Sequence, residues 1–287
     1  MPALLVASLI WAFSFGLIKT QLAGVPPHLV AFLRLALSAL LFVPWFRPRQ
    51  AGGRLLAQLA ALGAVQYGAM YLAYLASFAY LKASEVALWT IFTPIYVVLI
   101  ADAATRTFRR RNLAAAALSV LAAWLVSPPH GGTALAGIGL VQVSNLCFAA
   151  GQVWYRRLVP VSADVRDRDV FAALYFGGAL LAAVPVAVDT GMLRALGALT
   201  ATQIATLAYL GLIPSGLGFF LWNAGVRRSS EGAAAVLNNA KIPLAILVSW
   251  LLFEPLPSLA NLIRTLFALA LITAALRLAE KKRGRDS

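Results

Sequence analysis

Long apolar stretches, separated by short polar connections, follow one another along the whole chain. An α-helix needs about 20 apolar residues to cross the hydrocarbon core of a bilayer. Ten stretches approach this length, so we predict an all-α integral membrane protein with ten transmembrane helices. The predicted spans are 3–20, 28–46, 55–81, 85–103, 112–127, 134–157, 169–188, 201–226, 231–253 and 259–279.

Two of these stretches follow the same plan. Residues 82–102 and 228–254 each start with a basic residue and Ser-Glu, continue through an apolar run with a central proline, and end in an acid. Glu231 follows Glu85 at an offset of 146 residues, about half of the 287-residue chain. The pattern indicates a chain built twice, and the alternative to a functional role for the two copies is a duplication retained only for packing.

Such a duplication predicts two five-helix repeats, residues 1–130 and 131–287. Five is an odd number, so the second repeat must cross the bilayer upside down relative to the first. Inverted repeats around a central cavity are typical of secondary transporters, in which the two halves exchange roles.

Composition and charge agree with a membrane protein. Hydrophobic residues make up 61% of the chain and charged residues 12%, with a mean hydropathy of +0.83. The net charge of +14 does not indicate nucleic-acid binding, because the basic residues lie in short connections and no basic soluble module exists. Eighteen of the 24 Lys and Arg residues lie in connections on one side or in the C-terminal tail, which predicts cytoplasmic N- and C-termini.

Candidate catalytic chemistry is scarce. All ten acidic residues fall at predicted span ends or in connections, and His28 and His130 lie in connections without metal-ligand neighbours. An intramembrane enzyme would need paired carboxylates or a Ser/His set at matching depth. We therefore expect no enzyme, no metal and no cofactor, and the missing buried carboxylate disfavours proton-coupled export of cationic drugs.

Three features carry a resemblance to a known family. They are the LRLALSALLF run with Arg34, the Ala/Ser-rich entry and central proline of spans 85–103 and 231–253, and the acids Asp102 and Glu254. The chain resembles the drug/metabolite transporter superfamily, in its ten-helix EamA-type branch, over essentially its whole length. Asp102 stands where Glu is more usual, and the first repeat has no counterpart of Lys241.

The resemblance implies alternating-access export of small organic molecules across the bacterial inner (plasma) membrane. Within the branch the chain is similar to aromatic amino-acid exporters, which implies an aromatic or neutral amino acid as substrate. A phosphate-bearing metabolite or a drug is the alternative. The expected partners are this small molecule and the lipid bilayer, with the protein a monomer.

Lys241 lies ten residues into its predicted span, roughly 15 Å at 1.5 Å per residue, and therefore near the middle of the bilayer. A lysine there costs at least ~2.5–3.5 kcal/mol, so it should face a wet cavity or a partner. We predict that Lys241 binds a substrate carboxylate and that Asn238 or Asn239 binds other polar groups, with a structural role for Lys241 as the alternative. Arg34, near a predicted span end, is interpreted as structural and able to snorkel.

Aromatic and hydroxyl side chains supply the rest of the predicted substrate site, although aromatic residues also pack between helices. These candidates are Trp11, Tyr71, Tyr74, Trp89, Thr93 and Trp222. Prolines and glycines that interrupt a spanning helix are tolerated where they line a cavity, and they predict hinges. The predicted hinges are Pro94, Pro214, Gly216 and Pro243.

Overall fold

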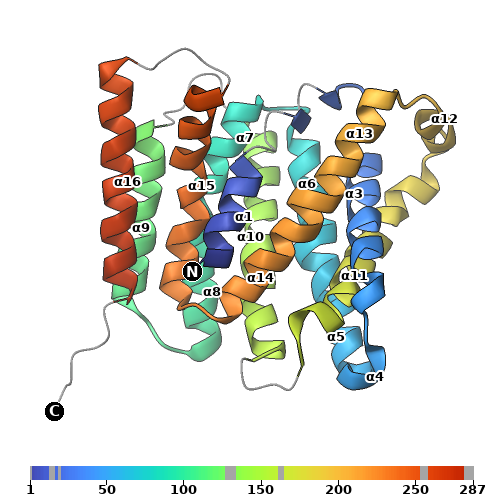
Figure 1. Cartoon of the computed structure of the whole chain (residues 1–287), viewed down its shortest axis with the longest axis horizontal. Helices are drawn as coiled ribbons and strands as arrows, with labels where there is room; N and C mark the ends of the chain where they lie inside the picture. Colours follow the sequence, from blue (N-terminus) through green and yellow to red (C-terminus); the bar gives the residue numbers. More distant parts are fainter. Residues whose placement is uncertain are drawn as a thin grey trace.

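The fold is an upright bundle of helices in a computed structural model that describes residues 2–12, 17–18, 21–126, 134–160, 165–252 and 258–280 (Figure 1). Within these ranges the chain forms helices and connections but no strand. The α-helices of the first half are α1 (Pro2–Ala12), α3 (Pro27–Phe42), α4 (Pro48–Ala51), α5 (Gly53–Gly63), α6 (Met70–Ser77), α7 (Ala83–Trp89), α8 (Thr93–Thr105) and α9 (Arg110–Val126). Those of the second half are α10 (Leu135–Leu158), α11 (Asp167–Val188), α12 (Met192–Gly197), α13 (Ala201–Leu210), α14 (Phe219–Arg227), α15 (Glu231–Leu252) and α16 (Leu259–Glu280).

Helices occur in each of the ten predicted stretches, but not all reach spanning length. Seven helical segments in the described part of the chain are long and apolar enough to cross a membrane, so the protein is a multi-pass helical membrane protein. Helix α1 is apolar but shorter. The count of ten spans therefore stays a prediction. The seven segments are Pro27–Trp45, Gly53–Ser77, Glu85–Thr105, Leu135–Leu158, Asp167–Val188, Ala201–Arg227 and Leu259–Glu280.

Two of these segments contain a π-helical turn. The turn η2 (Ala64–Ala69) joins α5 to α6, and η4 (Gly211–Gly218) joins α13 to α14, at matching places in the two halves. A π-turn often marks a functional site. The wider turn and Pro214 disturb the regular hydrogen bonding of η4.

Side chains from other helices use the carbonyls of η4. Ser38 donates to Gly211 O at 2.8 Å, Trp11 Nε1 to Pro214 O at 3.0 Å, and the Tyr175 hydroxyl to Ser215 O at 2.7 Å and Gly216 O at 2.6 Å. An irregular backbone is thereby satisfied inside the bundle, as membrane proteins require.

The predicted hinges occupy three settings. Pro214 and Gly216 lie within η4, and Pro243 lies inside α15. Pro94 lies in the first turn of α8, directly after a short 3₁₀ turn, η3 (Thr90–Phe92), that separates α8 from α7. Pro94 has no N–H to donate to Thr90 O, so a regular α-helix cannot continue through η3, and the hinge at Pro94 stays a prediction.

The two halves pack on one another in a reciprocal way. Helix α1 packs on α15, and its counterpart α10 packs on α8; η4 packs on α3, and η2 packs on α11. Other contacts join equivalent helices, such as α3 with α11 and α9 with α16. These contacts thus have a partner with the halves exchanged, whereas the extensive contact of α9 with α15 is not matched between α16 and α8 in the described structure.

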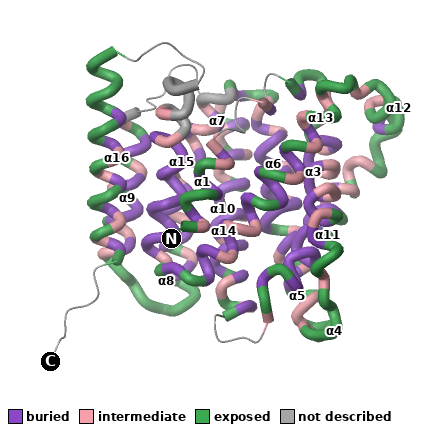
Figure 2. Tube along the Cα trace, in the orientation of Figure 1, coloured by how far each residue is buried: buried purple, intermediate pink, exposed green. Residues whose placement is uncertain are grey.

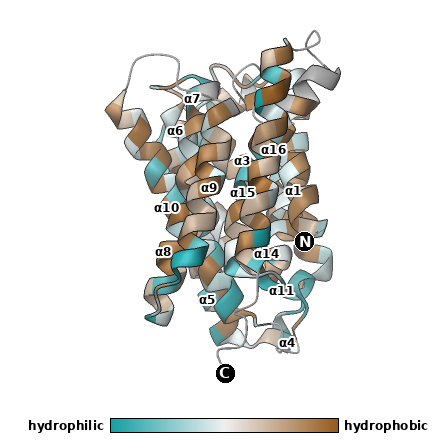
Figure 3. Ribbon diagram, turned by 90° about the vertical axis from the view of Figure 1, so that its left-hand side faces the viewer, coloured by the Kyte–Doolittle hydropathy of each residue, from teal (hydrophilic) through white to brown (hydrophobic). Residues whose placement is uncertain are grey.

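The outer surface suits lipid. Figure 2 shows exposed positions along the outward faces of α9 and α16, and Figure 3 shows hydrophobic residues over the middle of the bundle. The exposed apolar side chains of α16 include Leu259, Leu262, Ile263, Leu266 and Phe267. The basic connections α3–α5, α8–α9 and α14–α15 lie at the lower end in Figure 1.

Small residues bring α5 and α11 into backbone contact. A Cβ atom on Gly63 would collide with the Leu174 carbonyl, and one on Gly177 would collide with the Ala60 carbonyl. Close approach through glycine is a common way to pack helices in lipid, where van der Waals contact replaces the hydrophobic effect.

Candidate substrate-binding site

A cavity of about 90 Å³ lies between α1, α3, α6, α10 and α15. Its wall combines aromatic rings, hydroxyls, one amide and two cations. The described lining residues are Trp11, Ile18, Arg34, Met70, Tyr71, Tyr74, Thr90, Thr93, Ser144, Asn145, Phe148, Phe219 and Lys241.

Lys241 enters this cavity from α15 and is 8% exposed. Within the described residues its ammonium has no hydrogen-bond or ion-pair partner. Its Nζ lies 5.8 Å from the centre of the Trp11 ring, close enough for a cation–π interaction. Because no described anion or hydrogen-bond acceptor contacts this ammonium, it can bind an anion that enters the cavity.

Arg34 is the second cation of the wall, and the prediction of a snorkelling side chain is wrong. Arg34 is 2% exposed and turns into the bundle. Its Nε donates to Ser215 Oγ at 3.0 Å and its Nη2 to the Tyr71 hydroxyl at 2.8 Å. Because Ser215 belongs to η4, the irregular turn fixes the guanidinium from the opposite half of the chain.

Polar groups of α10 and the η3 region form another side of the cavity. Asn145 Nδ2 donates to Trp89 O at 2.8 Å and to Gln142 Oε1 at 3.2 Å. Thr90 and Thr93 donate to carbonyls three residues earlier, at 2.7 and 2.8 Å. Their oxygens keep free lone pairs and can accept hydrogen bonds from a substrate.

Aromatic packing builds the apolar wall around Trp11. Its ring lies 5.1 Å from Phe219, 5.1 Å from Trp222 and 5.9 Å from Phe148, measured between centroids. These spacings are typical of tilted and edge-on ring pairs. The wall offers flat apolar surface to a substrate beside the Lys241 ammonium.

Five predicted substrate-binding residues share this cavity: Lys241, Trp11, Tyr71, Tyr74 and Thr93. The other four are not among its lining residues. Asn239 donates to Ile91 O at 2.8 Å, and Asn238 is fully buried without a partner in the described structure. Trp222 packs behind Trp11 and donates to Gln152 Oε1 at 3.1 Å, whereas Trp89 stacks on Phe92.

Sequence reasoning missed several lining residues, including Arg34, Ser144, Asn145, Phe148 and Phe219. The signal for Arg34 is its charge inside an apolar span, but a structural role explains such a charge equally well. Ser144, Asn145 and Phe148 repeat at helical spacing along one face of α10, and this pattern could have indicated a polar side of the cavity.

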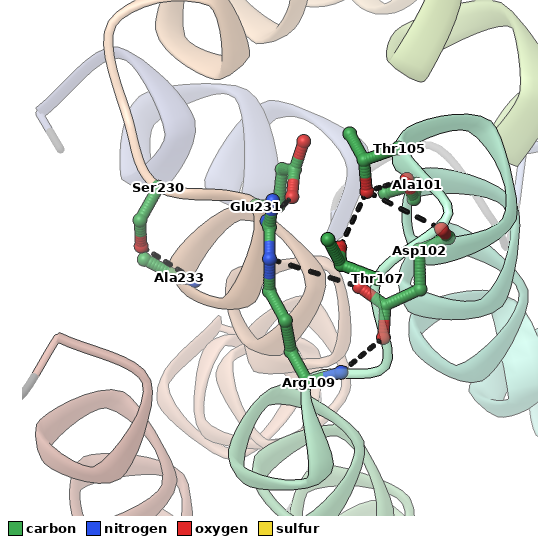
Figure 4. Close-up of polar contacts among 8 residues, drawn as sticks. All are labelled: Ala101, Asp102, Thr105, Thr107, Arg109, Ser230, Glu231 and Ala233. Carbon is green, nitrogen blue, oxygen red and sulfur yellow. Dashed lines mark hydrogen bonds and ion pairs between the residues drawn. The ribbon is translucent and has the colours of Figure 1, made fainter. Parts of the chain in front are cut away.

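Acidic residues are absent from the described cavity wall, and several lie at the lower end of the bundle. There Arg109 joins Asp102 at the end of α8 to Glu231 at the start of α15 (Figure 4). The Arg109 backbone N–H also donates to Asp102 Oδ2 at 2.8 Å. This cluster, Arg109–Asp102–Glu231, ties the two halves of the chain together.

A second cavity adjoins the first at the opposite end of the bundle. It lies between the turn before α3 and the end of α6, and the two cavities share Ile18. Glu254 and His130 lie outside the described residues, which hold no group of three or more potential metal ligands.

A known protein family and several known relatives are similar to this chain. The EamA-like transporter family matches residues 1–127 and 135–277. The chain is 33% identical over 260 residues to the biotin transporter of Salmonella typhimurium, covering 90% of this chain and 86% of that protein. It is 37% identical over 266 residues to a probable biotin transporter of Pseudomonas aeruginosa, covering 91% and 92%.

The biotin transporter of Escherichia coli K12 is 33% identical over 263 residues, covering 90% of this chain and 86% of that protein. A solved crystal structure matches the fold with a TM-score of 0.75 at 20% identity, covering 98% of each chain.

Proposed function

The chain belongs to the EamA-like transporter family, within the drug/metabolite transporter superfamily, and we propose that it carries biotin or a similar carboxylate across the membrane. Relatives named as biotin transporters match about nine-tenths of its length. The observation that carries the proposal is the Lys241 ammonium, which lacks a hydrogen-bond or ion-pair partner among the described residues beside an aromatic wall.

In the proposed complex Lys241 binds the carboxylate, and the substrate's apolar part lies against Trp11, Phe148 and Phe219. Bringing a carboxylate to a buried ammonium forms a charge-assisted hydrogen bond, stronger than a neutral one. The hydroxyls of Thr90 and Thr93 accept hydrogen bonds from the substrate's N–H groups. Asn238 and Asn239 position α15 rather than contact the substrate.

An aromatic or neutral amino acid, as the sequence indicated, is the less favoured substrate. Its carboxylate suits Lys241, but its α-ammonium would find no carboxylate among the described lining residues. The described lining residues include two cations and no acid, which favours a substrate with net negative charge over a zwitterion.

A phosphate-bearing metabolite is the second candidate. Arg34 adds the further cation that phosphate recognition would use. The aromatic wall and the named relatives favour the carboxylate.

Transport proceeds by alternating access of two inverted five-helix repeats, residues 1–130 and 131–287. The reciprocal packing and the matching π-turns η2 and η4 support this arrangement. The Arg109–Asp102–Glu231 cluster closes one end of the cavity and must open for the substrate to pass. We further propose a monomer in the bacterial inner membrane that exports its substrate, with both termini and the basic connections in the cytoplasm.

Counterflow in proteoliposomes tests the substrate. Vesicles preloaded with unlabelled biotin should accumulate labelled biotin, and external phenylalanine or glucose 6-phosphate should compete weakly. Phenylalanine exchange without biotin exchange would restore the amino-acid assignment, and strong competition by glucose 6-phosphate would favour the phosphate-bearing candidate.

A further inference from the structure

We propose that Arg34 recognises a second group of the substrate, a neutral hydrogen-bond acceptor such as a carbonyl or ureido oxygen. This inference rests on the proposed function, because it assigns the carboxylate to Lys241. It defines the substrate class as apolar carboxylates that carry an acceptor at the end remote from the carboxylate.

The first observation is an unused donor on Arg34. The guanidinium has five N–H groups, of which Nε and Nη2 donate to Ser215 and Tyr71. The remaining nitrogen, Nη1, is shielded from solvent and has no partner in the described structure. Buried donors are nearly always paired in native proteins, so an unpaired one in a cavity wall indicates that a ligand or a water completes it.

The second observation is that Arg34 is held rigidly. Its Cζ lies 4.5 Å from the centre of the Tyr71 ring, and the Tyr71 hydroxyl lies 2.9 Å from Ser215 Oγ. Ser215 in turn donates to Leu210 O at 2.8 Å. The guanidinium is thus fixed before the substrate arrives, and a fixed donor selects a partner without losing conformational freedom.

The third observation is that the two cations come from different helices. Lys241 comes from α15, which packs on α1, α8, α9 and α16, whereas Arg34 comes from α3, which packs on α11 and η4. Figure 1 shows these helices on different sides of α10 and α14. A substrate that reaches both cations therefore contacts helices from both halves of the chain.

Chemistry then selects the group at Arg34. A carboxylate already satisfies Lys241, and the free Nη1 can only donate. The matching group is an acceptor oxygen, and biotin carries one in its ureido ring at the far end from its carboxylate. Lipoate has a similar aliphatic carboxylate chain but a disulfide ring without such an oxygen, so the two molecules separate the roles of Arg34 and Lys241.

Dissociation constants of biotin and lipoate, measured on the purified protein, test the proposal. The wild type should bind biotin about tenfold or more tightly than lipoate, since a site built to hydrogen-bond a ligand group rejects an analogue without it. Arg34→Gln should weaken biotin binding about tenfold or more and change lipoate binding less than about twofold. The matched control Arg264→Gln, on the exposed face of α16, should change neither.

Equal weakening of both ligands by Arg34→Gln, or no weakening of biotin, would overturn the proposal. If this variant does not fold, the dissociation constants of biotin and lipoate for the wild type still test the proposal. Desthiobiotin keeps the ureido oxygen and should bind like biotin. Equal binding of lipoate and biotin would overturn the role of Arg34 but leave the proposed function standing. Binding of neither carboxylate would overturn the proposed function itself.

Discussion

Lys241 and Arg34 bring two positive charges to a cavity whose described wall holds no acid. Lys241 was recognisable in the sequence, because its depth in an apolar span excluded an easy route to water. Arg34 was not, because its contacts come from Ser215, 181 residues away, and from a turn whose shape the sequence did not define. Charge alone could not indicate which way Arg34 faces.

Tyr71→Phe tests whether Arg34 depends on its neighbours. The change removes the acceptor for Nη2 and the contact with Ser215, so we expect a loss of about 1–3 kcal/mol in stability. Thermal unfolding in detergent measures it. Tyr80→Phe is the control, because Tyr80 is 55% exposed; equal melting temperatures for the two variants would contradict the account.

At the scale of elements, hydropathy located the helices but not their irregularities. The apolar runs of spans 55–81 and 201–226 look continuous, yet each contains a π-turn. Pro214 and the glycines beside it indicate an interrupted helix at η4. The turn η2 contains no proline to indicate it in the sequence. It packs on α11, a contact that the local sequence does not show.

The contact of α5 with α11 gives an element-scale prediction. Gly177→Ala places a Cβ against the Ala60 carbonyl, which belongs to rigid backbone, so the helices must separate. We expect a loss of about 1–3 kcal/mol or more in stability, as for other overpacked interiors. Gly197→Ala is the matched control, because that glycine faces open space; fluorescence-detected size exclusion after heating compares them, and equal survival would refute close packing here.

At the scale of the whole molecule, several contacts between the halves have a partner with the halves exchanged, and the inverted repeat stays a prediction. The sequence could relate Glu85 to Glu231 but could not show that Glu231 meets Arg109 across the halves. That contact depends on how separate helices assemble. The Arg109–Asp102–Glu231 cluster is therefore a contact that only the structure reveals.

Glu231→Gln should favour the state that is open at the Arg109 end, because it removes one charge from the contact between the halves. In a Cys147→Ala, Ala233→Cys background, membrane-impermeant maleimide should then label Cys faster from the Arg109 side. Glu85→Gln, the matching change in the other repeat, should leave this rate unchanged. Equal labelling rates in both variants would mean that the cluster does not close the cavity.

The central claim is that Lys241 binds a substrate carboxylate, and one comparison tests it most directly. Biotin and its neutral primary amide differ at that group alone, so their dissociation constants isolate its charge. The wild type should prefer biotin by about tenfold or more, and Lys241→Met should remove most of that preference, whereas Lys82→Met in a connection should keep it. A preference for biotin that survives Lys241→Met unchanged would contradict the account.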